Sequence, residues 1–333
     1  MKKLLAILLS VIMVLSLVAC GNKTQGETPS NDDQQQNTET ETKTIKVGLI
    51  CIGDENDQGY TYNFIRGKEA ATEALAAKGI NVDWVVKYNI GEDSTCEDAN
   101  IELAEEGCEL IFNNSYGFEP FMLKVAPDYP EIQFVGCTNQ GSWNDGLENT
   151  HNAFANIYEG RYLAGVAAGM KLNEMIEAGK FTADEAKMGY VGAFTYAEVI
   201  SGYTSFYLGA KSVCPTVTMD VTFTGSWYDE ALEKEAANKL IAGGCKLISQ
   251  HADSTGAPAA CQEALDAGTT VYCVGYNVDM LAVAPTAALT SPTNVWEVFY
   301  EYAFRAVMNG ESFDQNWCQG YEADAVTLTP LGE

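Results

Sequence analysis

The sequence predicts an α/β protein built from two lobes, each a doubly wound parallel sheet covered by helices. Short apolar segments alternate with longer amphipathic segments along most of the chain, which is the pattern of βαβ units. The alternation runs twice, with a new start after residues 151–157. After the polar N-terminal region the chain is still too long for one small core, so two lobes are expected.

The first run of segments supplies the expected N-terminal lobe. Its apolar stretches read as strands at 45–52, 82–90, 109–114 and 132–138. The segments between them repeat apolar residues at helical spacing. They predict helices at 63–79, 93–107 and 119–130.

The second run begins with a long helix expected at 158–179. Strands are then expected at 188–194, 216–225, 246–252 and 271–277, with helices at 199–212, 229–243 and 257–267. Connections of this kind are right-handed and give parallel sheets. A late helix at 294–310 follows the last clear strand of the second run.

The N-terminus predicts export. Residues 1–19 contain two lysines followed by an uncharged, mostly apolar run, which is typical of a signal peptide and too short for a membrane span. The sequence Leu-Val-Ala-Cys at 17–20 resembles a bacterial lipobox, in which the cysteine becomes lipidated. Cys20 is therefore expected to anchor the protein on the extracytoplasmic face of the membrane. An ordinary secreted protein, with Cys20 near the cleavage site by chance, is the alternative.

Residues 20–43 are expected to form the lipidated cysteine and a disordered tether, because 21–43 lack large apolar residues. The net charge of -27, from 46 acidic and 19 basic residues, argues against a nucleic-acid partner, whose phosphates would be repelled. It also disfavours direct adhesion to anionic lipid, so the lipid on Cys20 must supply the attachment.

The ten cysteines can have two roles, either in disulfides or as buried apolar side chains. Disulfides are the default in an exported protein. However, Cys51, Cys137, Cys245 and Cys273 lie in or beside apolar segments, where cysteine behaves as a small buried hydrophobe. The sequence contains no C-x-x-C motif or Cys/His cluster, so no metal site is predicted.

Polar and aromatic residues follow several predicted strands directly. They occupy GDENDQGYTYN (53–63), NNSYGFEP (113–120), FTGSWYDE (223–230), SQHADSTG (249–256) and GYNVDM (275–280). In doubly wound sheets, ligands bind just beyond the carboxyl ends of the strands. These segments are therefore the expected binding loops.

The order of motifs resembles the basic membrane protein (BMP) family, the purine-nucleoside or purine-base binding lipoproteins of ABC importers. The similarity extends from about Lys46 to Pro330, and its most specific parts are Y-E-G-x-Y-L-A-G-x-x-A-G-M, G-S-W-Y-D and Q-H-A-D-S. It implies a type I periplasmic-binding-protein fold with a three-strand hinge, and permease subunits as partners. It also implies an N-terminal lobe of 44–155 plus 290–310 and a C-terminal lobe of 156–289 plus 311–333.

The resemblance implies candidate ligand-binding residues in the first lobe. Tyr60 matches an aromatic residue of the family, with Tyr116 and Phe118 as further aromatic candidates. Asp57, in the D-Q-G-Y segment, is included among the candidates. Glu119 lies where the family tends to have an acidic residue that can accept from a purine N–H; its alternative role is a favourable charge in the first turn of a helix.

In the second lobe, Trp227 matches the other stacking aromatic, with burial in the core as its alternative. Asp253 and Ser254 lie where a helix N-cap is expected, so capping competes with ligand binding for each. Gln250 and His251 lie on the strand end with side chains on opposite faces, so one of them is expected to face the cleft.

Two departures from the family pattern favour a free base over a nucleoside. Asn277 and Asp279 replace what is commonly an Asp-x-Asp ribose clamp, and Asn294 falls where nucleoside-binding members often have a lysine. The expected function is capture of a purine base or nucleoside, adenine favoured, for delivery to an ABC importer. No catalytic residue, cofactor or metal is expected.

The sequence does not match the motifs of calcium-binding loops or of several enzyme classes, because required residues are missing at the required positions. The loop at 54–65 resembles a calcium loop until its last position, Ile65, which cannot chelate. No phosphate-binding loop or G-x-S-x-G motif occurs, and Asp54 with Asp57 alone does not form the aspartate cluster of a nucleoside hydrolase. A sugar-binding importer component of the same fold and a ligand-sensing receptor lipoprotein remain as alternatives.

Overall fold

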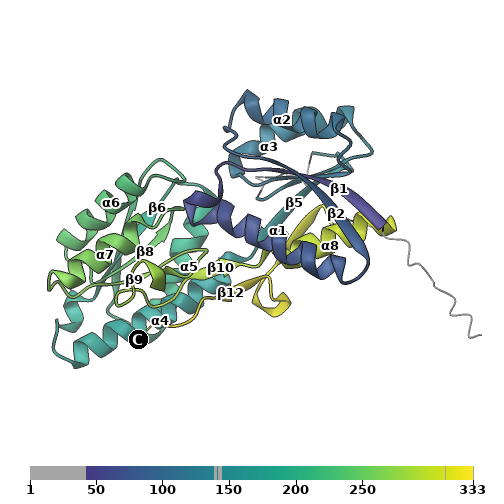
Figure 1. The fold of residues 1–333 in the computed structure, drawn as a ribbon. Helices are drawn as coiled ribbons and strands as arrows, with labels where there is room; N and C mark the ends of the chain where they lie inside the picture. Colours follow the sequence, from purple (N-terminus) through teal and green to yellow (C-terminus); the bar gives the residue numbers. More distant parts are fainter. Residues whose placement is uncertain (1–42, 139–140, 142–144, 312, 333) are drawn as a thin grey trace, which may run out of the picture. The chain divides into compact units, whose positions relative to one another are not determined.

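The computed structural model describes residues 43–138, 141, 145–311 and 313–332. The predicted signal peptide, Cys20 and nearly all of the tether lie outside these residues. Within the described part of the chain, no helix combines the length and apolarity needed to cross a bilayer. Both sheets of the fold belong to one compact unit (Figure 1).

The first sheet has six strands in the order β11-β5-β4-β3-β1-β2, and all its neighbouring pairs run parallel. The strands are β1 (Lys43–Ile50), β2 (Ile80–Lys87), β3 (Leu110–Asn113), β4 (Gln133–Gly136), β5 (Thr150–Ala155) and β11 (Asn316–Gln319). Four of them lie within about two residues of the predicted strands.

Helices cover both faces of the first sheet (Figure 1). They are α1 (Tyr60–Ala76) and α8 (Trp296–Asn309) on one face, and α2 (Ser94–Glu105) and α3 (Glu119–Val125) on the other. Alternate strand residues enter opposite cores, as the period of a strand requires. Phe112 packs with α1 and α8, whereas its neighbour Ile111 packs with α2 and α3. We call this sheet with its four helices the first lobe.

The second sheet has four parallel strands in the order β7-β6-β8-β9. They are β6 (Lys187–Gly192), β7 (Thr218–Phe223), β8 (Leu247–His251) and β9 (Tyr272–Val274). One face is covered by α4 (Ile157–Glu177) and α5 (Ala197–Val213), and the other by α6 (Glu230–Ala242) and α7 (Gly256–Asp266). We call this sheet with its helices the second lobe.

Glycines bring α4 and α5 into close contact. A Cβ at Gly165 would lie 2.1 Å from the carbonyl oxygen of Phe206, and one at Gly209 would lie 2.0 Å from that of Tyr162. Both distances are below any real Cβ contact, so the helix backbones touch through these glycines. The two glycines of the A-G-x-x-A-G-M part of the sequence motif therefore lie in the contact between the middle of α4 and α5.

The chain passes between the two sheets three times. It crosses from β5 to α4, then through β10 (Pro292–Asn294) into α8, and finally from β11 into β12 (Val326–Leu328). β10 and β12 pair antiparallel with each other. The fold class is thus the predicted one: two doubly wound parallel sheets joined by three connections.

The placement of β11 differs from the expected division of the chain. Residues 311–333 were expected in the C-terminal lobe, but Asn316–Gln319 pair with β5 of the first sheet, with Trp317 opposite Ala153. Trp317 is buried and its ring lies 4.8 Å from that of Phe299 on α8. Burial of this indole against α8 explains why the segment stays with the first sheet before crossing.

Short 3₁₀ helices occupy several loops. They are η1 (Glu55–Asp57), η2 (Tyr116–Phe118), η3 (Ala126–Asp128), η5 (Ala183–Glu185), η6 (Met280–Ala282) and η7 (Tyr321–Ala323). The nine cysteines in the described part of the chain are free thiols, and all but Cys318 are buried. The four predicted as small hydrophobes are among the buried ones.

Candidate functional site

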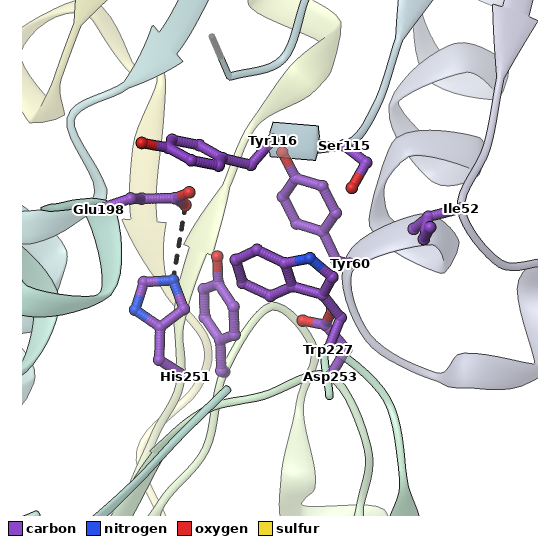
Figure 2. Close-up of a pocket in the computed structure, with 9 residues that line it drawn as sticks. Ile52, Tyr60, Ser115, Tyr116, Glu198, Trp227, His251 and Asp253 are labelled. Atoms are coloured by element: carbon purple, nitrogen blue, oxygen red, sulfur yellow. Dashed lines mark ion pairs between the residues drawn. The ribbon is translucent and has the colours of Figure 1, made fainter. Parts of the chain in front are cut away.

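A cavity lies where loops of the two lobes meet. Figure 2 shows the side chains that line it. The lining residues are Ile52, Tyr60, Ser115, Tyr116, Glu198, Trp227, His251, Asp253 and Tyr276. They follow β1 and β3 in the first sheet and end or follow the four strands of the second. This is the position at which doubly wound sheets bind ligands.

The position of Tyr60 is set by a cap on α1. The carboxylate of Asp57 accepts hydrogen bonds from the backbone N–H groups of Gly59 (2.8 Å), Thr61 (2.8 Å) and Tyr62 (3.0 Å). These donors would otherwise have no partner at the start of the helix. Tyr60, the first residue of α1, projects its ring into the cavity while its hydroxyl donates to the Cys137 carbonyl oxygen at 2.6 Å.

Aromatic side chains from both lobes form the walls. The rings of Tyr116 and Tyr196 stack across the lobes with centroids 4.6 Å apart and an interplanar angle of 23°. The indole of Trp227 lies 5.9 Å from Tyr196 and 5.1 Å from Phe194. Aromatic contacts of this geometry contribute about 0.5–1.5 kcal/mol beyond their buried area. They hold the walls in fixed orientations.

The polar groups of the cavity are two carboxylates, those of Glu198 and Asp253, together with hydroxyl, indole and imidazole groups. Glu198 Oε1 lies 3.5 Å from His251 Nε2. Burial, reinforced by the positive charge of Arg161, lowers the pKa of His251 to about 4, so the imidazole is neutral at neutral pH. Burial raises the pKa of Asp253 well above its usual value. None of the nine lining residues is a lysine or an arginine.

A buried positive charge lies behind one wall of the cavity. The guanidinium of Arg161 is fully buried and its Cζ lies 3.9 Å from the centroid of the Tyr276 ring. Its Nη1 donates to the Gln250 carbonyl oxygen at 2.5 Å, while Nε and Nη2 have no hydrogen-bond partner among the described residues. The guanidinium therefore makes a cation–π contact with the Tyr276 ring, which forms part of the cavity wall.

Five candidates from the sequence line the cavity: Tyr60, Tyr116, Trp227, His251 and Asp253. The backbone N–H of Asp253 donates to the Trp227 carbonyl oxygen at 2.8 Å, which places these two residues side by side. Of the neighbouring pair on β8, the histidine faces the cavity.

Gln250, which precedes His251 on β8, faces away from the cavity. Its Nε2 donates to the carbonyl oxygens of Ala252 (2.8 Å) and Ser254 (2.7 Å), which folds the loop after β8.

Neither Asp253 nor Ser254 is the N-cap residue of α7, although Ser254 bonds the first N–H of the helix. Ser254 Oγ accepts from the Gly256 N–H at 3.1 Å, whereas the N-cap residue of α7 is Thr255 and makes no capping side-chain bond. No described residue hydrogen-bonds the carboxylate of Asp253, which is only 6% exposed. Its position in the cavity is therefore not explained by helix capping.

The structure places the remaining candidates outside the cavity. Asp57 is occupied by the α1 cap described above. Phe118 is fully buried in the core under α2 and α3, and Glu119 Oε1 accepts from the Gly141 N–H at 2.9 Å in the first turn of α3. Asp279 is exposed and caps η6 by accepting from the Leu281 N–H at 2.9 Å.

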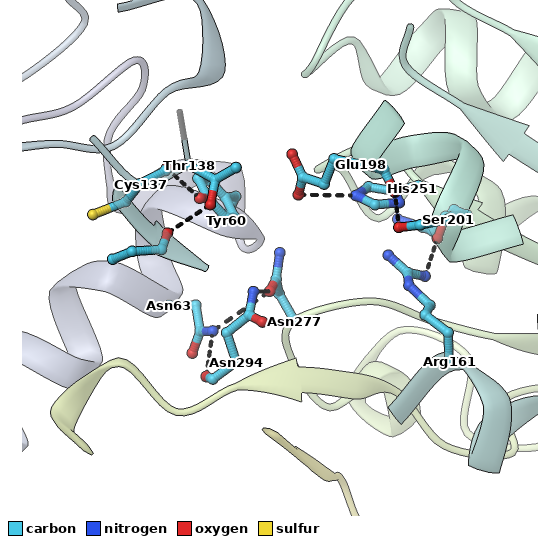
Figure 3. A network of polar contacts seen from close by, with 12 residues as sticks. Tyr60, Asn63, Cys137, Thr138, Arg161, Glu198, Ser201, His251, Asn277 and Asn294 are labelled. Carbon is cyan, nitrogen blue, oxygen red and sulfur yellow. Dashed lines mark hydrogen bonds and ion pairs between the residues drawn. The ribbon is translucent and has the colours of Figure 1, made fainter. Parts of the chain in front are cut away.

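Asn277 lies in a polar network at the crossings between the lobes (Figure 3). Its Oδ1 lies 3.4 Å from Nδ2 of both Asn63 and Asn294. Asn63 also donates to the Asn294 carbonyl oxygen at 2.8 Å. Asn277 has a φ of 62°, a left-handed conformation that asparagine tolerates better than most residues. It therefore ties α1 of the first lobe to the loop after β9.

Sequence reasoning missed four lining residues, Ile52, Ser115, Glu198 and Tyr276, and two residues behind the walls, Tyr196 and Arg161. Glu198 follows β6, whose end carries the same mixture of aromatic and polar residues as the other strands, so the strand-end rule could have found it. Tyr276 lies inside one of the expected loops. Arg161 occupies a variable position of the long motif, and Tyr196 was not considered.

Comparisons with known proteins support a solute-binding role. The chain is 33% identical over 287 residues to a purine-binding protein of Brucella abortus, covering 86% of this chain and 75% of that protein. It is 31% identical over 288 residues to a candidate ABC transporter glucose-binding protein of Haloferax volcanii, covering 86% of this chain and 64% of that one.

A solved solute-binding protein of an ABC transporter system from Aeropyrum pernix superposes with a TM-score of 0.76 at 19% identity, covering 86% of this chain and 76% of that one. The fold is therefore that of the type I periplasmic-binding proteins. Residues 44–330 match the Bmp family model, described as ABC transporter substrate-binding protein PnrA-like. The chain belongs to this family of ABC transporter substrate-binding proteins.

Proposed function

We propose that this protein captures a purine base, adenine first, in the cavity between its lobes and delivers it to an ABC importer. The observation that carries the proposal is the composition of the cavity. Aromatic side chains from both lobes line it together with two carboxylates, those of Glu198 and Asp253. A purine is flat, has two π-faces and carries N–H donors on its edge.

Each part of the cavity has a role toward such a ligand. Stacking on Tyr60 or Trp227 contributes about 1–3 kcal/mol per base and tolerates different bases. Glu198 and Asp253 supply acceptors for the exocyclic amine and the ring N–H. Neutral His251 supplies one donor and one acceptor. Binding without chemistry suits this set, because the site contains positioned hydrogen-bonding groups and no nucleophile paired with a base.

A free base is favoured over a nucleoside by the placement of two residues. Asp279 and Asn277 occupy the positions of the ribose clamp, but Asp279 is exposed on η6 and Asn277 binds the other asparagines at the crossing. Neither lines the cavity. The resemblance to a purine-binding relative at 33% identity further supports a purine ligand.

A sugar is the second candidate, favoured by the relative named for glucose binding. Sugars also stack their C–H faces on aromatic rings and donate hydroxyl groups to carboxylates. The two ligand classes differ in shape, because a base is planar and presents two π-faces, whereas a sugar ring is puckered and presents C–H groups.

Attachment to the membrane is the second part of the proposal. Substrate-binding proteins of this family work outside the cytoplasm, where they meet the permease. We infer that a lipid on Cys20 holds the protein there, because the sequence at 17–20 resembles a lipobox.

Mass spectrometry of ligand released from protein purified without additions tests the proposal most directly. Calorimetric titration with adenine, adenosine, ribose and glucose then ranks the ligands. Trp227→Ala should weaken adenine binding, whereas Tyr321→Ala, an exposed aromatic residue outside the cavity, should not. Binding of a sugar alone would favour the second candidate. Binding of none of the four would refute the purine assignment.

A further inference from the structure

Glu92 makes three hydrogen bonds with one carboxylate oxygen, although it does not line the cavity. It lies in the loop between β2 and α2 of the first lobe. Its Oε1 accepts from the Ser115 hydroxyl at 2.7 Å, from the Gly117 N–H at 2.9 Å and from Nε1 of Trp227 at 3.2 Å. The first two donors belong to the first lobe and the third to the second lobe.

These partners are the supports of two cavity walls. Ser115 and Gly117 flank Tyr116, so their bonds to the carboxylate fix the loop that presents this ring. The third bond fixes the indole of Trp227 by its only polar atom. One carboxylate oxygen therefore sets the orientation of an aromatic residue from each lobe.

The sequence accommodates this contact through a glycine. A Cβ on Gly117 would lie 2.3 Å from Cδ of Glu92, closer than real Cβ atoms approach other heavy atoms. Any other residue at position 117 would push the carboxylate away. Acceptance from three donors by a charged group is also stronger than a set of neutral bonds.

We propose that Glu92 is a positioning residue of the binding site, which orients Trp227 against the Tyr116 loop when the lobes are together. Since its donors come from both lobes, the bond to Trp227 exists only while the lobes meet. The indole is then held at its ring nitrogen, and its face toward the cavity is fixed before a ligand stacks on it. The role of Glu92 depends on the proposed function at one point, which is that the bound ligand contacts Trp227.

A double-mutant cycle tests it. Glu92→Ala should raise the Kd for adenine roughly tenfold, mainly through faster dissociation, and Glu92→Gln should raise it less because the amide oxygen still accepts. In a Trp227→Phe background, which lacks the indole N–H, Glu92→Ala should raise the Kd for adenine by a much smaller factor. Glu97→Ala is the matched control, since this carboxylate on α2 pairs with Lys124 and has no contact with the cavity.

A second readout needs no ligand. Glu92→Ala should change the tryptophan emission of the free protein, and the change should be absent in the Trp227→Phe background. If no ligand binds but the emission coupling is seen, the purine assignment fails and the role of Glu92 stands. Equal effects of Glu92→Ala in both backgrounds, or no effect in either readout, would overturn the proposal.

Discussion

Replacing Asp253 by asparagine separates ligand binding from folding, because the structure predicts opposite effects on the two. The carboxylate lines the cavity, is 6% exposed and does not cap α7. If the ionised carboxylate accepts a hydrogen bond from bound adenine, Asp253→Asn should weaken adenine binding by about 1.5–3 kcal/mol. This corresponds to a rise of about 10- to 150-fold in Kd, measured by calorimetry.

The same change should not destabilise the free protein at neutral pH. Burial is the main reason that the pKa of Asp253 is raised, and the charges of Asp57 and Glu233 raise it further. A raised carboxyl pKa gives stability that is complete below the unfolded pKa and is lost as pH rises through the folded pKa. Asparagine cannot ionise, so the variant should lack this loss. Urea unfolding between pH 4 and 8 measures the difference from the wild type.

Asp279→Asn is the matched control, because Asp279 is exposed and caps η6, a role that asparagine fills about equally well. It should leave the affinity for adenine unchanged. The reasoning is refuted if Asp253→Asn leaves the Kd for adenine within about twofold. A loss of more than about 1 kcal/mol of unfolding free energy at neutral pH would instead indicate a structural role of the size of a helix cap.

Three further predictions concern other parts of the molecule. Trp227→Ala should raise the Kd for adenine about 5- to 150-fold, with a smaller rise for Trp227→Phe, in the same titration. Burial raises the pKa of Glu233 to about 7, so its contribution to stability is lost as pH rises from about 4.5 through 7. Glu233→Gln should flatten the denaturation profile over that interval, and an unchanged slope would contradict the assignment. Cys20→Ala should move the protein from the membrane to the soluble fraction of cells, and its retention on membranes would count against a lipid anchor.

Long periodic elements were predictable from the sequence, and short ones with mixed composition were not. All eight α-helices of the described chain were expected, seven of them within three residues of both ends, and α3 ends five residues before its predicted end. β5 was not expected as a strand, because Thr150–Ala155 mixes polar and small residues and lacks the apolar run of its neighbours. β11 has one buried residue, Trp317, and it depends on α8 for its place at the edge of the sheet. Tertiary packing decides such segments.

The site was predictable at the level of loops but not of individual side chains. The strand-end rule found the loops that carry Tyr60, Trp227 and Asp253. It could not tell which residue in a loop faces the cavity, because that depends on local turns. Asp57, for example, lies three residues before Tyr60 but turns back to cap α1. Arg161 could not be found by this rule at all, since it acts from inside a helix through another side chain.

The asparagines at the lobe crossing have a consequence for the environment in which the protein works. Asn63, Asn277 and Asn294 join the lobes through amide groups alone, and none of them changes charge with pH. A carboxylate–ammonium pair at the same place would lose its attraction in acid. The amides do not, so acidification outside the cell leaves this connection between the lobes intact while it alters the cavity. Ligand retention can then vary with acidity without any change in these hydrogen bonds between the lobes.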